Sequence, residues 1–89
     1  MLAKDLQQAV DDAKEIYNKF GMKGGEELQL VLTQMVFQMG KTRVLGFKKA
    51  LAAMGTGDYK TAGKEMRDSS WYRQTPKRCE RLARIVESL

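Results

Sequence analysis

The sequence contains no histidine and a single cysteine, Cys79, and these two shortages exclude several kinds of chemistry. Zinc sites built on histidine, cysteine–histidine nucleophile pairs and serine–histidine–aspartate triads all need a residue that this chain lacks. One cysteine cannot form an intramolecular disulfide, so the sequence gives no sign of an oxidising compartment. It therefore predicts no cofactor and no metal site.

Long apolar stretches are missing as well. Charged residues make up 30% of the chain, and no uninterrupted apolar run approaches the ~20 residues that a bilayer requires. At the N-terminus, Asp5, Gln7 and Gln8 interrupt the stretch where a secretory signal would need an apolar core. We expect no membrane span, and we expect the chain to be made in a cytoplasm, that of a bacterial host cell if a phage encodes it.

The first part of the chain has the periodicity of two helices. Apolar residues recur at three- and four-residue steps over residues 2–20, and the Gly21–Gly25 segment then interrupts the pattern. Glu26 and Glu27 place negative charge where a second helix would begin. Its apolar residues, between 28 and 39, cover most of the circumference, so this helix is predicted to lie in the middle of the core.

Four further helical segments are predicted after Gly40 from capping residues and glycine turns. They are Val44–Met54, capped by Thr42 and with a break at Gly46; a helix from the cap Asp58 to about Arg67; a short turn after Ser69 or Ser70; and a last helix from Thr75-Pro76 to about Ser88. Cys79 lies on the apolar side of the last helix and is predicted to be buried. With no strand pattern, the sequence predicts an all-α fold of about six helices, in a single domain over residues 1–89.

Charge is distributed unevenly along the chain. Residues 1–27 carry four lysines against six carboxylates, a net charge of −2, whereas residues 41–89 carry twelve lysines and arginines against five carboxylates, a net charge of +7. Such a surface favours nucleic acid, anionic lipid or the bacterial envelope as partners. A solvated helical surface that keeps a small protein soluble is the alternative interpretation.

Two segments carry a family resemblance. Met-Val-Phe-Gln-Met-Gly at 35–40 and Ser-Trp-Tyr-Arg-Gln-Thr-Pro-Lys-Arg at 70–78 resemble signature stretches of T-even-type phage lysozymes, in glycoside hydrolase family twenty-four. The family pattern extends without a gap from Met35 to Leu89, including Gly46-Phe47 and Ala62, and a looser match reaches back to Asp5. The resemblance implies the family's C-terminal lobe, without the N-terminal lobe that carries the chemistry.

The catalytic residues of that family are absent. The family uses a glutamate acid, an aspartate or cysteine nine positions later and a threonine six positions beyond that, because glycoside hydrolysis needs a proton donor and a second catalytic group. No glutamate in this chain has an aspartate or cysteine nine positions later. We therefore assign no catalytic residue and expect the isolated chain not to be an enzyme.

The resemblance nevertheless implies a binding site. Phe37 and Gln38 correspond to residues at the edge of the family's substrate cleft, although Phe37 is equally interpretable as a core residue. Arg78 stands where the family carries an arginine that reaches the catalytic acid of the other lobe. These three residues are the candidate substrate-binding residues.

Trp71, Tyr72 and Pro76 are predicted to support that site structurally. Gln38 lies within an apolar helix and needs a hydrogen-bond partner. The indole N–H of Trp71 is the predicted donor to the Gln38 carbonyl, since the indole can only donate.

Two departures from the family alter these expectations. Ala50 and Glu65 stand where relatives carry small polar groups facing the cleft, so contacts to sugar and stem peptide on that side do not transfer directly. In addition, the family's first helix packs in the C-terminal lobe, and nothing in this sequence supplies it. We predict an apolar groove there, filled by a protein partner or a second copy, or else by helix Leu2–Phe20 after movement about the Gly21–Gly25 segment.

Three functional hypotheses follow. The first is a phage-encoded, lysozyme-derived module that binds peptidoglycan or a protein partner without chemistry. The second is a fragment or subunit of a muramidase that cleaves peptidoglycan only with a separate N-terminal lobe. The third is a basic helical nucleic-acid binder, which charge alone supports, so nucleic acid is the least favoured partner.

Overall fold

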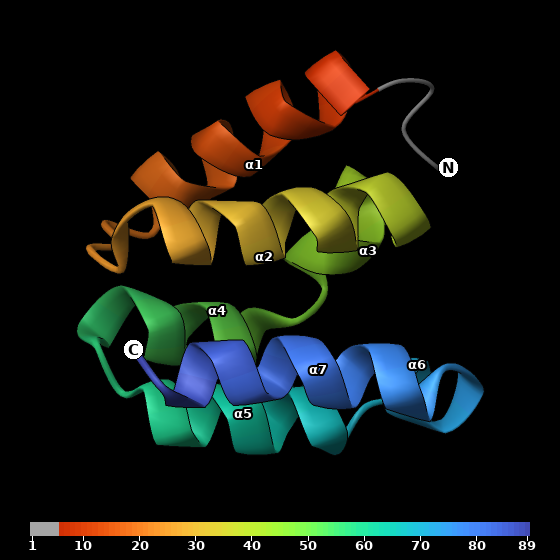
Figure 1. The fold of residues 1–89 in the computed structure, drawn as a ribbon. Helices are drawn as coiled ribbons and strands as arrows, with labels where there is room; N and C mark the ends of the chain where they lie inside the picture. The colour runs from red at the N-terminus through yellow and green to blue at the C-terminus, as the bar shows by residue number, and fades with distance from the viewer. Residues whose placement is uncertain (1–5) are drawn as a thin grey trace.

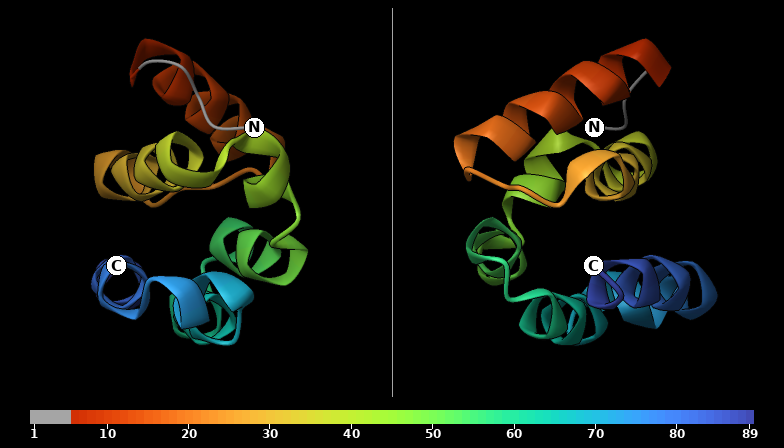
Figure 2. Two further views of the ribbon diagram at one scale, coloured as in Figure 1. Left: turned by 90° about the vertical axis from the view of Figure 1, so that its right-hand side faces the viewer. Right: turned by 60° about the vertical axis from the view of Figure 1, so that its left-hand side comes forward.

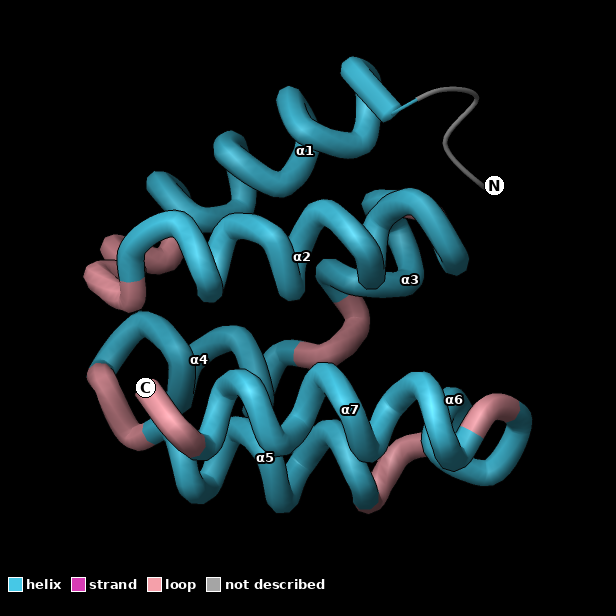
Figure 3. Tube along the Cα trace, in the orientation of Figure 1, coloured by secondary structure: helices cyan, strands magenta, loops and turns pink. Residues whose placement is uncertain are grey.

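The computed structural model of the protein describes residues 6–89, and every regular element in that range is a helix (Figure 3). The helices are α1 (Leu6–Lys19), α2 (Gly25–Met39), α3 (Lys41–Leu45), α4 (Lys48–Thr56), α5 (Tyr59–Arg67), α6 (Ser70–Gln74) and α7 (Pro76–Glu87). The all-α prediction is confirmed. Within residues 6–89, no helix has both the length and the hydrophobicity needed to cross a bilayer.

The helices form two layers (Figure 1). One layer contains α1, α2 and α3, with α1 packed along α2; the other contains α4, α5, α6 and α7, with α7 packed along α5. The chain crosses from the first layer to the second between α3 and α4 (Figure 3). Figure 2 shows the two layers from the side, with α2 and α7 facing each other across the boundary.

Helix α2 supplies the largest share of the core. Leu28, Leu32, Met35 and Val36 are fully buried, and Val31 is almost completely buried. The prediction that this helix lies in the middle of the core is correct for most of its circumference. It is wrong for Leu30 and Phe37, whose side chains remain 60% and 46% exposed. Both lie on the side of α2 that also carries the exposed residues Glu27 and Gln34.

The segment after Gly40 differs from the prediction. Helix α3 begins at Lys41 with Gly40 as its N-cap, so Thr42 is inside the helix and does not cap it. The break at Gly46 is complete and separates α3 from α4, which gives seven helices among the described residues instead of about six. Thr75 does precede Pro76 at the start of α7, but its hydroxyl donates to the Trp71 carbonyl at 3.2 Å and does not cap α7.

Other helix ends agree with the sequence. The side chain of Asp58 accepts the Thr61 amide at the start of α5, and the hydroxyl of Ser69 accepts the Tyr72 amide at the start of α6. These bonds satisfy backbone donors that a first helical turn leaves without a partner. On α7, Cys79 is fully buried, as its position on the apolar side predicts.

Helix α1 packs against α2 and α3 in the first layer. Gly21 and Gly25 adopt φ values of 63° and 77°, which residues with a Cβ rarely take. The hydroxyl of Tyr17 accepts the Gly25 amide at 2.9 Å, and Glu15 pairs with Lys41 of α3. The predicted start of this helix at Leu2 lies outside the described residues.

Arg67 of α5 connects α5 to α7. Its guanidinium donates two hydrogen bonds to Glu80, at 2.8 and 2.9 Å, and also pairs with Glu87. Glu80 further accepts a bond from Arg84 at 2.9 Å. These cations stabilise the ionised carboxylates, so the hydrogen bonds from Arg67 lower the pKa of Glu80 to about 2 and also lower the pKa of Glu87.

A substitution at Gly55 of α4 tests how closely α4 packs against the end of α1. A Cβ at position 55 would lie 2.4 Å from the backbone carbonyl oxygen of Phe20, at the end of α1. We expect Gly55→Ala to destabilise the protein by about 1–3 kcal/mol, because a backbone atom must move to admit the methyl group. Urea denaturation measures this change.

The control measures the effect of helix propensity alone. Propensity favours alanine over glycine within a helix, so by itself it would make Gly55→Ala stabilising. Ala52 is an exposed residue of α4, and Ala52→Gly should cost about 1 kcal/mol through propensity alone. If α1 did not meet α4 at Gly55, Gly55→Ala would stabilise the helix, and a higher urea midpoint would contradict the packing described above.

Candidate functional site

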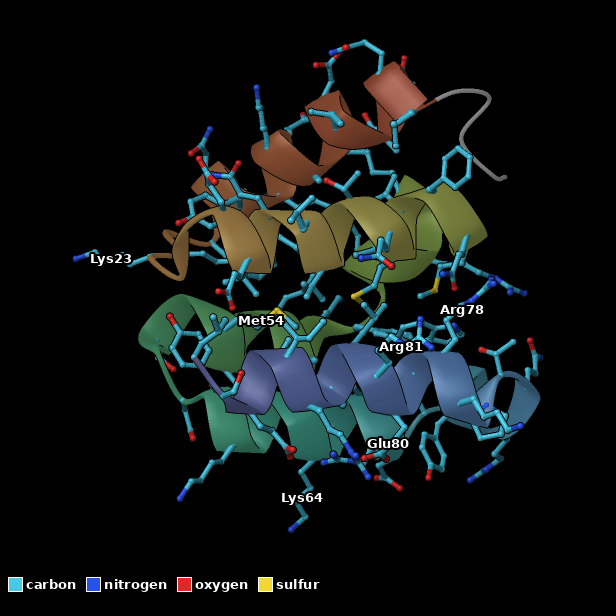
Figure 4. All side chains as sticks on the ribbon, viewed as in Figure 1. Lys23, Met54, Lys64, Arg78, Glu80 and Arg81 are labelled. Atoms are coloured by element: carbon cyan, nitrogen blue, oxygen red, sulfur yellow. The ribbon has the colours of Figure 1, made fainter. Side chains whose placement is uncertain are left out.

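One hollow in the described surface, here called the groove, lies between the two layers. It is a cavity of about 500 Å³ lined by Leu6 of α1, by Thr33, Gln34, Phe37 and Gln38 of α2, and by Arg78, Arg81 and Leu82 of α7. The groove thus combines apolar side chains, amides and two guanidinium groups. Figure 4 shows Arg78 and Arg81 on the side of α7 that faces α2.

A second cavity, here called the cleft, continues from the groove towards α3 and α6. It measures about 490 Å³ and is lined by Gln38, Met39, Arg43, Gly46, Phe47, Ser70, Trp71, Gln74, Thr75 and Arg78. The rings of Phe47 and Trp71 lie 6.0 Å apart with a tilt of 43°. Gln38 and Arg78 line both cavities and mark their junction.

The three predicted substrate-binding residues meet at this junction. Phe37 lines the groove, and Gln38 and Arg78 line both cavities. The core interpretation of Phe37 does not hold, since its side chain is 46% exposed. Arg78 is the third residue of α7, and its guanidinium has no carboxylate partner among residues 6–89.

Trp71 and Gln38 share the cleft, but the predicted hydrogen bond between them is wrong. Trp71 is 7% exposed and packs against Phe47, whereas Gln38 is half-buried, and no hydrogen bond joins the two. No fully buried side-chain nitrogen or oxygen in the described part of the chain lacks a partner. The indole N–H therefore reaches solvent in the cleft and does not need the amide.

The backbones of Tyr72 and Pro76 belong to the first turns of α6 and α7. The Tyr72 amide donates to the Ser69 hydroxyl at 3.3 Å, which fixes the start of α6, and the Tyr72 ring packs against the core. Pro76 occupies the first turn of α7, where its missing N–H costs nothing. Neither residue lines the groove or the cleft, and their supporting role stays a prediction.

Arg81, Leu6 and Arg43 are among the lining residues that were not predicted from the sequence. Arg81 follows Arg78 by three positions and so shares its face of α7, a helical spacing that is sufficient to predict it. Leu6 reaches the groove only because α1 packs on α2. Arg43 reaches the cleft only because the helix breaks at Gly46, and no local signal gives the direction of that turn.

A third, smaller cavity, here called the side pocket, adjoins the cleft. It measures about 310 Å³ and is lined by Gly46, Phe47, Lys48, Lys49, Ala50, Glu65 and Ser69. Ala50 and Glu65, the two positions that depart from the family, therefore lie beside the cleft. Glu65 is the one carboxylate that lines any of these three cavities.

Glu80 and Glu87 are poorly suited to acid catalysis. Glu80 and Glu87 both bind Arg67, and that interaction lowers the pKa of each. A glycosidase acid must instead stay protonated near neutral pH, which requires a raised pKa. Glycoside hydrolysis also needs a second catalytic group, and Glu65 has no carboxylate companion in its pocket.

Cys79 is equally unsuited to nucleophilic chemistry. Its thiol is fully buried and donates to the Met66 carbonyl at 3.4 Å, and burial raises the pKa of Cys79 to about 11. A thiol with such a pKa carries almost no thiolate at neutral pH. Cys79 is therefore a small core residue.

Comparison with known proteins identifies relatives along most of the chain. The sequence is 38% identical over 60 residues to probable T4-type lysozyme 1 of Dictyostelium discoideum, a match that covers 67% of this chain and 35% of that protein. It is 45% identical over 58 residues to the pre-baseplate central spike protein of Enterobacteria phage T4, covering 65% of this chain and 10% of that protein. It is 31% identical over 78 residues to a peptidoglycan hydrolase of Pseudomonas phage phiKMV, covering 88% of this chain and 9% of that protein.

These relatives confirm the resemblance to T-even-type phage lysozymes and show that the chain is lysozyme-related. The chain spans about a third or less of the length of each of the relatives named above. No family model matches the sequence, and no solved structure matches it significantly.

The position of the Trp71 indole leads to a prediction about the stability of two variants. We expect Gln38→Leu to change the free energy of unfolding by no more than about 0.5 kcal/mol, because it leaves no buried donor without a partner. Trp71→Ala removes a buried ring and should cost about 3–5 kcal/mol. Urea denaturation of the two variants compares them directly. A loss of 2 kcal/mol or more in Gln38→Leu would mean that the amide does bind the indole.

Proposed function

We propose that this chain is a lysozyme-related module that binds peptidoglycan and does not cleave it. The observation that carries the proposal is the cleft, which offers aromatic rings, amides, hydroxyls and guanidinium groups to a ligand but no carboxylate among its described lining residues. Polar side chains and rings suit a sugar polymer, and arginine binds carboxylates in a bidentate manner. A similar protein of phage phiKMV is named a peptidoglycan hydrolase, which supports the same polymer as ligand.

The residues themselves support the proposed absence of cleavage. No glutamate has the family's catalytic spacing, and Arg67 holds Glu80 and Glu87 in the ionised form. An enzyme without a proton donor has little means of assisting the departure of the leaving sugar. The proposed role is therefore recognition, and the site residues are Phe37, Gln38 and Arg78, with Trp71 as the wall of the cleft.

Sedimentation with purified peptidoglycan sacculi tests both the binding of peptidoglycan and the absence of cleavage. We expect the chain to pellet with the sacculi and to leave the turbidity of the suspension unchanged over hours. A chain that stays in the supernatant would overturn the binding role. Clearing of the suspension that disappears in Glu65→Gln would overturn the non-catalytic role, since Glu65 is the one carboxylate lining the three cavities.

A second candidate is supported by the coverage of the relatives. The match to the Dictyostelium lysozyme accounts for 35% of that protein, so a muramidase of this type contains much more polypeptide than this chain. In this alternative the chain is a fragment or subunit, and a separate N-terminal lobe supplies the acid that Arg78 meets. The groove, with Leu6, Phe37 and Arg81, is then the surface on which that lobe docks.

Mixing the chain with the unmatched part of the Dictyostelium lysozyme, produced separately, tests this candidate. If the chain is half of an enzyme, the mixture should clear sacculi, Arg78→Gln should abolish the clearing, and light scattering should detect a heterodimer. A mixture with neither clearing nor a change in mass would contradict it. A mass that rises with the concentration of the chain alone would instead indicate a second copy in the groove.

The other candidate partners, a protein and a nucleic acid, have less support. One relative is named a central spike protein of a pre-baseplate, which supports a protein partner for this chain. Basic charge is the sole support for a nucleic acid. Synthesis in the cytoplasm of a phage-infected host agrees with the two phage relatives and is part of the proposal.

A further inference from the structure

Helix α2 carries a narrow exposed stripe, here called the seam, along most of its length. The residues of the seam are Glu27, Leu30, Gln34 and Phe37, all of them exposed, and they follow one another at steps of three, four and three positions. This spacing places the four side chains in one line along the helix, and it is the spacing at which two helices pack side by side. Most of the residues between them are buried in the core.

The seam has more apolar surface than a solvated side of a helix usually has. Leu30 is 60% exposed and Phe37 is 46% exposed. Leu6 of α1, which lines the groove with Phe37, is 61% exposed. Three of the four large hydrophobic residues that are exposed among residues 6–89 therefore lie on the seam or at its end. A single exposed leucine is ordinary, but an apolar row with this spacing indicates a helix that packs against another helix.

The charges at the two ends of the seam are opposite. Glu26 and Glu27 occupy the first turn of α2. At the other end, Phe37 lines the groove together with Arg78 and Arg81 of α7, and Figure 4 shows both arginines on the side of α7 that faces α2. A surface that is acidic at one end, mostly apolar in the middle and basic at the other end is complementary to itself about a two-fold axis.

We propose that two copies of this chain associate through the seam, with their α2 helices antiparallel. In this arrangement Leu30 of each copy packs against Phe37 of the other. Glu27 of each copy lies at the end of the seam where Arg81 of the other copy is found. The two Gln34 side chains meet near the two-fold axis, where their amides can pair and fix the register. A second copy supplies the matching apolar and charged groups in the required order.

The contact is small, so the dimer is weak. Stable interfaces bury roughly 1,200 Å² or more in total, whereas the seam belongs to one helix of 15 residues, with Leu6 beside it. We therefore expect a reversible dimer with a dissociation constant between the micromolar and the millimolar range.

The dimer leaves the cleft available in each copy. The cleft lies towards α3 and α6, and Phe37 is the one proposed site residue on the seam, so Gln38 and Arg78 stay with the ligand. Two clefts in one particle bind a repeating polymer more tightly than one cleft does. The inference itself does not depend on what the cleft binds.

Sedimentation equilibrium of the full chain, from micromolar to millimolar concentration, tests the proposal. The average mass should rise from that of one chain towards that of two. Leu30→Gln should weaken the association by about tenfold or more, because it removes an apolar side chain from the centre of the contact. The control is Ala52→Gln, which places the same amide on an exposed position of α4, in the other layer, and should leave the association unchanged.

Charge reversal tests the orientation of the two copies. Glu27→Arg and Arg81→Glu should each weaken the association by about threefold at low ionic strength. The variant that carries both changes should regain it, because opposite charges then meet again at both ends of the seam. Lys64→Glu is the control, since Lys64 is an exposed cation of α5 that points away from α2 (Figure 4). Thermal melts check that every variant remains folded.

Four results would overturn the proposal. They are a mass that stays that of one chain up to millimolar concentration, an association that Leu30→Gln leaves unchanged, and a double charge variant that is as weak as the single ones. The fourth is a chain that is monomeric alone but forms a heterodimer with the unmatched part of the Dictyostelium lysozyme, which would then occupy the seam instead of a second copy. None of these measurements uses peptidoglycan, so failure of the dimer and failure of the proposed function are separate results.

Discussion

The structure depends on the burial of helix α2, which packs against α1 within its own layer and against α7 of the other layer. Leu28, Leu32, Met35 and Val36 are removed from water by α1 on one side and by the second layer on the other. Such burial is the dominant favourable contribution to folding, and a chain of this size has little of it to spare. Because α2 contacts both α1 and α7, it sets the position of each relative to the other, and with it the width of the groove.

The location of the site follows from that arrangement. Phe37 and Gln38 of α2 line the groove together with Arg78 and Arg81 of α7. The break at Gly46 lets the chain pass to the second layer and brings Arg43 and Phe47 to the other end of the same surface. The elements that build the core therefore also build the groove and the cleft, which explains why these cavities cross the layer boundary.

Some charged side chains form ion pairs, whereas others line the cavities. Glu15, Glu80 and Glu87 pair with Lys41 and Arg67 and hold helices together, and these interactions lower the pKa of each carboxylate. Such carboxylates are structural and are unable to donate a proton near neutral pH. Arg43, Arg78 and Arg81, which line the groove and the cleft, have no carboxylate partner within residues 6–89.

The sequence by itself determined the helical class, the caps at Asp58 and Ser69, the buried side of α7 and the relation to lysozymes. These features depend on local backbone chemistry, on periodicity or on residue identity, all of which can be read along the chain. Phe37, Gln38 and Arg78 were also identified, through the resemblance. Tertiary structure alone decided that Leu30 and Phe37 stay exposed, that Trp71 meets Phe47 and not Gln38, and that Arg43 and Leu6 reach the site. Each of these outcomes depends on which helix covers which face, and that is fixed by contacts between residues far apart in the sequence.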